Sequence, residues 1–362
     1  MNEIASLIGK QVILIRPGGE LGIKSRRTRR RMISNLIETL KEYNNFILRF
    51  KIFEYRDRLI LKLDDDSNIN EFVDLISKTI SGISSLSIAF VGSSNEQELL
   101  KDGLDFSKKK INPEGTFAIR VNREGNHPYK SLEIASKLGA LLKTNIPNLK
   151  VDLDTPEHRI YLDIRGEYVF YYTDKILGID GIPTKSQGKS LAIIKPNTNS
   201  LFAAWLMKKR GVEVIPIFFK TNKENYQDYI GKIKKEFYSN PCLIDISGFL
   251  NENQSELELC LLCQAYCEKI AEKIAQKENL TVIISPTCFN CKNEMMNLKA
   301  LTFLEKNLDI SVIRPIQMNY HGDKSLFQGI DNFSCCSYKT KIEIIKSSDK
   351  FYEININSDL KL

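Results

Sequence analysis

The sequence lacks the features of a membrane or secreted protein. It contains no apolar run approaching the roughly 18–20 residues that span a bilayer. Its first residues, MNEIASLIGKQ, include an acid and place no basic segment before an apolar core, so no secretory signal is expected. Its three histidines, His127, His158 and His321, have no repeated spacing, and neither a Ser-His-Asp set nor a Walker-type loop is visible. We therefore expect a cytoplasmic protein that contacts no membrane and whose histidines are structural or exposed.

The charge of the chain is unevenly distributed. Of 362 residues, 42% are hydrophobic and 27% are charged, as in ordinary globular proteins of two or three domains, and the net charge is +7. Segment 24–31 holds six basic residues and no acid, namely Lys24, Arg26, Arg27, Arg29, Arg30 and Arg31. A charge run is often only a solvated helix face, but this density favours a polyanionic partner.

The first half of the chain predicts two mixed α/β regions. Residues 1–93 have a β-α-β-β-α-β order typical of a ferredoxin-like fold, with strands at 11–16, 46–54, 58–63 and 84–92 and helices at 26–43 and 69–80. Residues 94–185 begin with a charged connector. Strands then follow at 115–122, 149–153, 159–164 and 168–172, with a helix at 130–143. A turn-rich linker, DGIPTKSQGK, ends this half.

The second half, residues 186–362, alternates apolar strands with helices. Strands are expected at 190–194, 212–219, 243–246, 280–284 and 311–313, and helices at 199–210, 222–237, 256–277 and 293–307. This order predicts a mostly parallel, doubly wound sheet. In such a sheet the turn between the first strand and its helix is a usual place for a phosphate, because the helix N-terminus offers unpaired N–H groups.

Three stretches resemble the tRNA 4-thiouridine synthetases (tRNA sulfurtransferases), in particular their archaeal type. ILIRPGGELGIKSRRTRRRM resembles the family's opening, and GTFAIRVNREGNHPYKSLEIASKLGALL resembles a THUMP domain, an RNA-binding module. GKSLAIIKPNTNSLFAAWLMKKRG resembles the flanks of its PP-loop. The resemblance implies a ferredoxin-like domain at 1–93, a THUMP domain at 94–185 and a PP-loop pyrophosphatase-like domain, of the adenine nucleotide alpha hydrolase type, at 186–362. It also implies contacts between tRNA phosphates and the basic segment, together with Arg120, Arg123 and Lys130.

The turn at 195–200 departs from the family's Ser-Gly-Gly-x-Asp-Ser pattern. Lys195 stands at the Ser, Pro196 and Asn197 at the two glycines and Asn199 at the Asp, so only Ser200 is retained. Proline has no N–H to offer a phosphate, and a side chain at 197 takes up space that glycine would leave open. The family's later Thr-Gly segment reads IISPTCFNCK here. We therefore interpret Lys195, Asn197, Asn199 and Ser200 as the remnant of a nucleotide loop, and the sequence argues against ATP and Mg²⁺ as ligands.

Eight cysteines suggest metal or sulfur chemistry. Cys260 and Cys263 match a Cys-x-x-Cys pair of the archaeal-type proteins, and Cys336 aligns with the family's essential sulfur-handling cysteine. By resemblance these three are candidate ligands of an iron–sulfur cluster, with Cys336 also catalytic. Cys288 and Cys291 are outside the family pattern, but with the first pair they have a spacing that suits zinc. Cys242 and Cys267 are expected to be buried apolar residues.

Three functions remain open at this point. The first is a divergent family member that binds tRNA and has lost or outsourced ATP activation. The second is a working ATP-dependent tRNA sulfurtransferase, whose reaction adenylates a tRNA uridine and then replaces AMP with sulfur. The third is a metal-binding scaffold or regulator associated with RNA. The expected partners are tRNA and a sulfur donor or an intact paralogue, and a homodimer is a further candidate.

Overall fold

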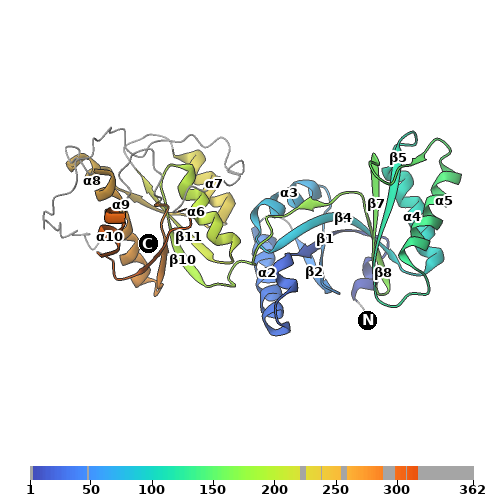
Figure 1. Ribbon diagram of the computed structural model, residues 1–362, viewed down its shortest axis with the longest axis horizontal. Coiled ribbons are helices and arrows are strands. Elements are labelled where there is room, and N and C mark those ends of the chain that lie inside the picture. The colour runs from blue at the N-terminus through green and yellow to red at the C-terminus, as the bar shows by residue number, and fades with distance from the viewer. Residues whose placement is uncertain are drawn as a thin grey trace. The chain divides into compact units, whose positions relative to one another are not determined.

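The computed structural model describes residues 3–46, 49–220, 226–237, 239–253, 259–287, 298–306 and 308–316. The chain divides into two compact units, Met1–Pro183 and Thr184–Leu362 (Figure 1). Unit 1 contains the regions predicted as ferredoxin-like and THUMP domains, and unit 2 contains the predicted α/β region.

Unit 1 is built on a single nine-stranded sheet in the order β2-β3-β1-β4-β8-β7-β5-β6, with β9 paired to β4. The strands are β1 (Gln11–Pro17), β2 (Phe50–Tyr55), β3 (Arg58–Leu63), β4 (Ile83–Ser93), β5 (Thr116–Glu124), β6 (Lys150–Val151), β7 (His158–Arg165), β8 (Tyr168–Tyr172) and β9 (Ile176–Leu177). The helices are the 3₁₀ helix η1 (Glu3–Leu7), α1 (Gly19–Gly22), α2 (Arg26–Phe46), α3 (Ile69–Thr79), α4 (Glu96–Lys110) and α5 (Ser131–Asn145). The two predicted domains thus share one sheet, joined where β4 pairs with β8.

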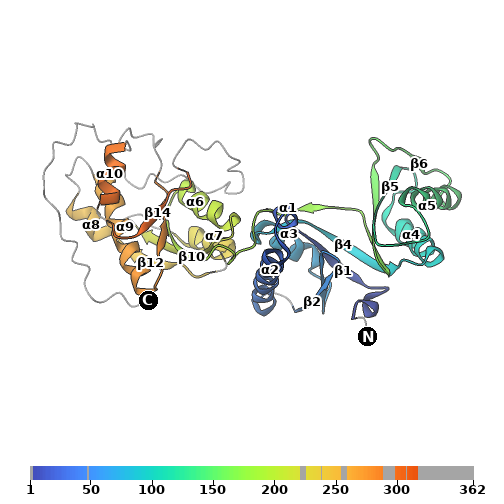
Figure 2. The same ribbon diagram turned by 60° about the horizontal axis from the view of Figure 1, so that its bottom comes forward.

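The α-helices of this unit pack on one face of the sheet (Figures 1 and 2). On β7 and β8, alternate residues such as Leu162 and Tyr171 pack under α4 and α5, while their neighbours point to the opposite face. At one end of that opposite face, η1 covers Val12, Leu14 and Phe170. In the part of unit 1 that the structure describes, the opposite face carries no α-helix.

Two predictions for unit 1 were wrong. The charged connector after residue 93 is helix α4, whose N-terminus is capped because Asn95 Oδ1 accepts from the N–H groups of Gln97 and Glu98. Its inward stripe contains small residues such as Gly103, where an added Cβ would lie 3.0 Å from Leu138, so the apolar periodicity is weak. The strand expected from residue 46 begins at Phe50, because α2 extends to Phe46.

Unit 2 contains the predicted doubly wound parallel sheet, in the order β12-β11-β10-β13-β14. The strands are β10 (Lys189–Ile194), β11 (Glu213–Lys220), β12 (Cys242–Asp245), β13 (Val282–Ile284) and β14 (Ser311–Ile313). The helices are α6 (Thr198–Lys209), α7 (Gln227–Phe237), α8 (Ser247–Glu252), α9 (Leu259–Lys277) and α10 (Leu298–Lys306). The strand order reverses between β10 and β13, and the crevice at their carboxyl ends is where such sheets usually hold a ligand.

Helix α9 supplies much of the core of unit 2. Its residues Cys267, Ile270 and Ala271 pack against Leu191 and Ile193 of β10. Helix α6 contacts β10 and β11 as well. The central strand is therefore buried, as its continuous apolar run predicts.

Candidate functional site

The turn between β10 and α6 is closed by its own hydrogen bonds. The N–H of Asn197 donates to Lys195 O at 2.6 Å, and Asn197 Oδ1 caps α6 by accepting from the N–H of Ser200 at 2.8 Å. Ser200 Oγ accepts from the N–H of Lys195 at 3.1 Å and lies 2.7 Å from Lys195 O. Tyr229 of α7 donates its hydroxyl to Asn197 O. Burial raises the pKa of the Tyr229 hydroxyl, so it is a neutral donor at this turn.

Lys195 turns its side chain into the protein. The residue is only 4% exposed, and its Nζ lies 2.8 Å from Gln264 Oε1 and 3.7 Å from Cys263 Sγ, both on α9. The other side chains of the predicted remnant differ in exposure. Ser200 is fully buried, whereas Asn197 and Asn199 are half-buried.

From Gln264 a buried polar network crosses the carboxyl ends of β13 and β14. Gln264 Nε2 donates to Glu268 Oε1 at 2.9 Å. Glu268 is fully buried and accepts from Ser285 Oγ at 2.6 Å and from Arg314 Nη2 at 3.0 Å. Thr287 Oγ1 lies 2.8 Å from the Ser285 hydroxyl. A doubly wound sheet usually holds its ligand at this place. Here the polar side chains hydrogen-bond to one another instead.

The network contains residues that sequence reasoning missed. Gln264 and Glu268 lie four residues apart on the buried side of α9, and a buried carboxylate needs a partner. Ser285 and Arg314 directly follow β13 and β14, so the predicted parallel order already placed them at the same sheet edge as Lys195. Together these two signals could have pointed to a polar network, although neither identifies which residues pair.

The predicted metal ligands are described in part. Cys336, Cys288 and Cys291 lie outside the described residues, as does the side chain of Cys260 in the first turn of α9. Cys263 is 1% exposed and lies in the apolar core beside the Lys195 ammonium. Among the residues that the structure describes, no cluster of three or more His, Cys, Asp or Glu side chains could hold a metal ion. Cys267 is buried and Cys242 is half-buried, and burial raises the pKa of the Cys242 thiol.

The basic segment forms the start of α2. Ser25 Oγ accepts from the N–H of Thr28 at 3.3 Å, which caps the helix. Arg29 pairs with Asp57 at 2.7 Å and so links the helix to the β2–β3 turn. The other arginines of the segment are exposed and, within the described part of the chain, form no ion pair; they are Arg26, Arg27, Arg30 and Arg31. Lys24 is half-buried in the turn before them.

Cations in the first turn of a helix face the positive end of its dipole, which costs about 0.3–1 kcal/mol each. The first turn of α2 has no acidic residue that would offset this cost. A bound anion would satisfy both the guanidinium groups and the helix end. The arginines in the first turn of α2 thus lower the stability of the helix but provide a site that suits a phosphate.

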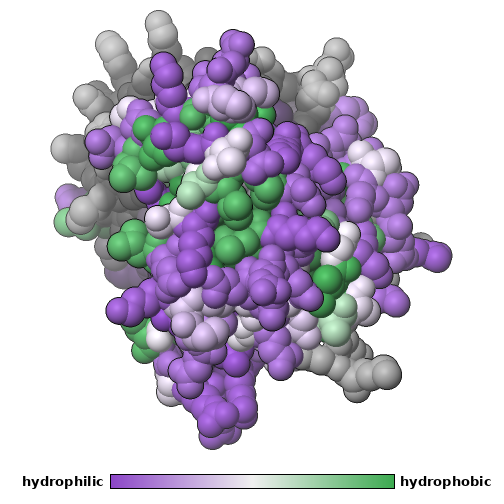
Figure 3. Space-filling model, turned by 90° about the vertical axis from the view of Figure 1, so that its right-hand side faces the viewer, coloured by the Kyte–Doolittle hydropathy of each residue, from purple (hydrophilic) through white to green (hydrophobic). Residues whose placement is uncertain are grey.

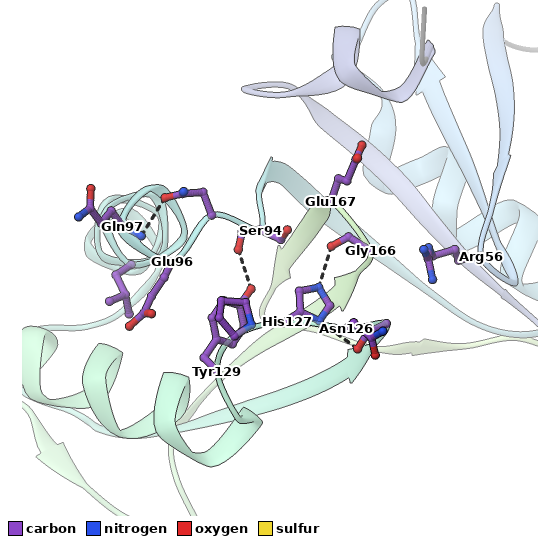
Figure 4. A pocket seen from close by; sticks show the side chains of 13 residues that line it. Arg56, Ser94, Glu96, Gln97, Asn126, His127, Tyr129, Gly166 and Glu167 are labelled. Atoms are coloured by element: carbon purple, nitrogen blue, oxygen red, sulfur yellow. Dashed lines mark hydrogen bonds between the residues drawn. The ribbon is translucent and has the colours of Figure 1, made fainter.

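A groove of about 1020 Å³ lies between the β2–β3 turn and the loops of the second half of unit 1 (Figure 4). Its lining includes Arg56, the N-terminus of α4, loop 125–129 and the β7–β8 turn. His127 is fixed in this wall because its Nε2 lies 2.7 Å from Gly166 O and its ring stacks on Tyr129. Tyr129 donates its hydroxyl to Ser94 O at 2.6 Å. The structural role expected for His127 is consistent with these contacts.

The three basic residues predicted around this region differ in surroundings. Arg123 Nη1 donates to Gly125 O at 3.2 Å and lies 3.4 Å from His127 Nδ1, so Arg123 holds the loop that lines the groove. Arg120 is exposed and donates to Leu153 O. Lys130 is exposed at the start of α5, next to the groove. Arg120 and Lys130 thus present charge to solvent, whereas Arg123 positions a loop.

Hydrophilic residues dominate the face shown in Figure 3, and apolar residues form separate patches on it. Exposed apolar side chains in the second half of unit 1, after residue 93, include Leu132 of α5 and Val151 of β6. Scattered exposed apolar residues are normal for globular proteins. None of the described helices is long and apolar enough to cross a bilayer.

Fold and site geometry define a protein with an N-terminal ferredoxin-like and THUMP unit followed by a nucleotide-type parallel α/β unit. Comparisons with known families agree. The model of the ThiI ferredoxin-like domain matches residues 12–87, that of the THUMP domain residues 93–174, and that of the thiamine biosynthesis protein (ThiI) residues 185–321. With these three models matched in order, the chain belongs to the ThiI family of tRNA sulfurtransferases.

Curated relatives and solved structures extend the comparison. The chain is 28% identical to the probable tRNA sulfurtransferase of Thermoanaerobacter pseudethanolicus (84% of this chain, 82% of the relative), and 26% identical to that of Methanocaldococcus jannaschii (85% and 84%). A 4-thiouridine synthetase–RNA complex with bound ATP has the same fold, with a TM-score of 0.70 and 22% identity over 84% of this chain and 80% of that one. PH1313 from Pyrococcus horikoshii gives a TM-score of 0.67 and 23% identity, over 88% and 97%.

Proposed function

We propose that this protein is a tRNA-binding member of the family that acts in, or derives from, tRNA sulfur modification and has lost the ATP-adenylation site. The observation that carries the proposal is the closed turn between β10 and α6. A pyrophosphate cradle needs several backbone N–H groups aimed at one point. Here the N–H groups of Lys195, Asn197 and Ser200 donate to atoms of the turn itself, and Pro196 has none.

The position of the Lys195 side chain supports the same proposal. An ammonium group facing solvent at this turn would be available to a phosphate as a point charge. Lys195 is instead buried against α9, where its ammonium donates a hydrogen bond to Gln264 Oε1. Binding ATP would therefore require breaking internal hydrogen bonds as well as forming new ones.

The surface of unit 1 supports the RNA part of the proposal. Exposed arginines that form no ion pair with the described residues start α2, and the exposed Lys130 lies beside the groove. Such cations bind phosphates without regard to base sequence. Curated relatives named tRNA sulfurtransferases, together with the neighbour solved as an RNA complex, make tRNA the polyanion that we propose.

An assay of ATP–pyrophosphate exchange in the presence of tRNA tests the loss of adenylation. We expect no exchange above the level of a protein-free control, because pyrophosphate has no cradle at the turn. A curated relative from the same family, such as the Thermoanaerobacter pseudethanolicus protein, serves as the comparison. Exchange that requires both tRNA and this protein would favour the second candidate, an active sulfurtransferase, to which the family membership and the neighbour with bound ATP point.

The cysteines carry a separate proposal, in which Cys260, Cys263 and Cys336 share an iron–sulfur cluster. The ammonium of Lys195, 3.7 Å from Cys263 Sγ, would stabilise a thiolate there and would also oppose a metal cation. We expect anaerobically purified protein to absorb visible light and the Cys263→Ala variant to lose that absorbance. Colourless protein with stoichiometric zinc would instead support the set Cys260, Cys263, Cys288 and Cys291. Protein with neither metal would contradict both sets.

A further inference from the structure

A pair of tyrosines lies on the face of the unit 1 sheet that carries no α-helix. Tyr161 of β7 and Tyr172 of β8 are register partners and stack with ring centroids 5.0 Å apart and planes 9° from parallel. Each ring has a cation over it. Arg16 Cζ of β1 lies 4.6 Å from the centre of the Tyr172 ring, and Lys175 Nζ lies 4.8 Å from the centre of the Tyr161 ring.

The acid that attracts these two cations, Asp163, is already hydrogen-bonded to other groups. Asp163, 1% exposed, is the buried carboxylate nearby, but its oxygens are used by Arg58 Nε at 3.0 Å and Arg165 Nε at 2.7 Å. Within the described part of the chain, neither Arg16 nor Lys175 forms an ion pair. Arg16 donates from Nη1 to Ser87 Oγ at 3.0 Å, whereas its Nη2 is buried without a hydrogen-bond partner.

The electrostatics agree with this geometry. Burial and the neighbouring cation Arg16 lower the pKa of the Lys175 ammonium, and Asp163 offsets this only in part. Burial also lowers the pKa of the Arg16 guanidinium, by more than Tyr172 and Asp163 raise it. Cations that repel each other and leave a donor unpaired are stabilised when an anion binds between them. Because each tyrosine ring already carries a cation, the cluster offers charge rather than a free surface for stacking a base.

Accessibility fits such a ligand. Tyr172 belongs to the buried cluster that η1 forms on this face with Val12 and Leu14, whereas Arg16 and Tyr161 are half-buried. Lys175 is exposed. Arg120 of β5, a predicted RNA contact, is the register partner of Tyr161 on the neighbouring strand β7. The cluster therefore continues a basic surface that reaches β5.

We infer that Arg16 and Lys175, held over the Tyr172–Tyr161 pair, bind a backbone phosphate of RNA on the helix-free face of the sheet. This inference rests on the proposed tRNA-binding function and adds a contact that the basic segment of α2 does not supply. A contact to one phosphate should be independent of base identity and sensitive to salt.

The test compares Lys175→Gln with wild-type full-length protein in binding a tRNA transcript over a series of salt concentrations. Loss of one phosphate contact should lower the slope of log affinity against log salt by about 0.7–0.9, equivalent to roughly fivefold weaker binding near 0.15 M salt. Lys175→Arg should retain wild-type binding because it keeps the charge. Lys143→Gln is the matched control, since Lys143 is an exposed lysine of α5 that forms no ion pair with any described residue.

Each outcome decides something different. If wild-type protein binds tRNA and Lys175→Gln has the same affinity and slope, this inference fails while the proposed function stands. If wild-type protein does not bind tRNA, both fail. If Lys175→Gln weakens calorimetric binding of inorganic phosphate but leaves tRNA affinity and slope unchanged, the cluster takes a small phosphate compound and the RNA contact is overturned.

Discussion

Calorimetric titration of the protein with ATP and Mg²⁺ is expected to show no saturable binding below about 1 mM. The turn between β10 and α6 would have to give up the hydrogen bonds between Asn197 and Ser200 and between Lys195 and Ser200 before its N–H groups could face a phosphate. Pro196 removes one further donor. Each lost charge-assisted hydrogen bond costs roughly 1.5–3 kcal/mol, so two such losses convert a micromolar site to a millimolar one.

Two variants distinguish the effect of the turn residues on ATP binding from the effect of the buried Lys195. In Pro196→Gly/Asn197→Gly the glycines of the family pattern return, but Lys195 remains buried against Gln264, so we expect ATP affinity to stay weak. Asn197→Gly also removes the cap of α6 and serves as the control for stability, followed by thermal unfolding. A micromolar dissociation constant for wild-type protein that disappears on Lys195→Ala would show instead that this turn binds nucleotide in a different way.

Reversing the charges of Arg27, Arg30 and Arg31 to Glu is expected to weaken tRNA binding by roughly 100-fold or more at 0.1 M salt, because about three phosphate contacts are lost. Filter binding with several tRNA transcripts measures this, and all should lose affinity by similar factors, since phosphates carry no sequence information. The fold should tolerate the change. The three side chains are exposed, and acids near a helix N-terminus are favoured by its dipole.

The matched control is the reversal of Lys108, Lys109 and Lys110 to Glu. These three lysines are exposed at the end of α4, and their reversal changes the net charge by the same amount at a different place. We expect a much smaller loss of affinity there. Equal losses in the two triple variants would mean that total charge, rather than the start of α2, governs binding. An unchanged affinity in the α2 variant would remove this surface from the RNA site.

Local patterns predicted most of the elements because each is set by nearby residues. The strands at 58–63, 168–172 and 311–313 match to the residue, and the alternation of strand and helix after residue 186 predicted the parallel sheet. Helix α4 was missed because its buried stripe uses Gly103 and Ser107, which a hydrophobic period does not detect. The continuous sheet of unit 1 depends on the pairing of β4 with β8, a long-range contact that no local pattern contains.

The same distinction applies to the candidate sites. The sequence identified the altered turn at Lys195 and the basic start of α2, since both depend on residue types at adjacent positions. It did not indicate that Lys195 contacts Gln264, which lies 69 residues away. The cluster of Arg16, Tyr172, Tyr161 and Lys175 was likewise missed, because its members come from three strands and a loop and meet only through sheet register.

The shared sheet of unit 1 has a mechanical consequence. Strand β4 is hydrogen-bonded to β1 on one side and to β8 on the other, so the basic start of α2 and the groove around His127 are mounted on one continuous hydrogen-bonded lattice. Two surfaces on a common lattice keep a fixed separation, unlike surfaces on domains joined by a linker. Unit 1 can thus select a ligand by the distance between the groups that contact the two surfaces. Under the proposed function, an RNA whose phosphates reach both the start of α2 and Lys130 beside the groove gains both contacts without the entropic cost of aligning two bodies, and an RNA that does not match can use only one of them at a time.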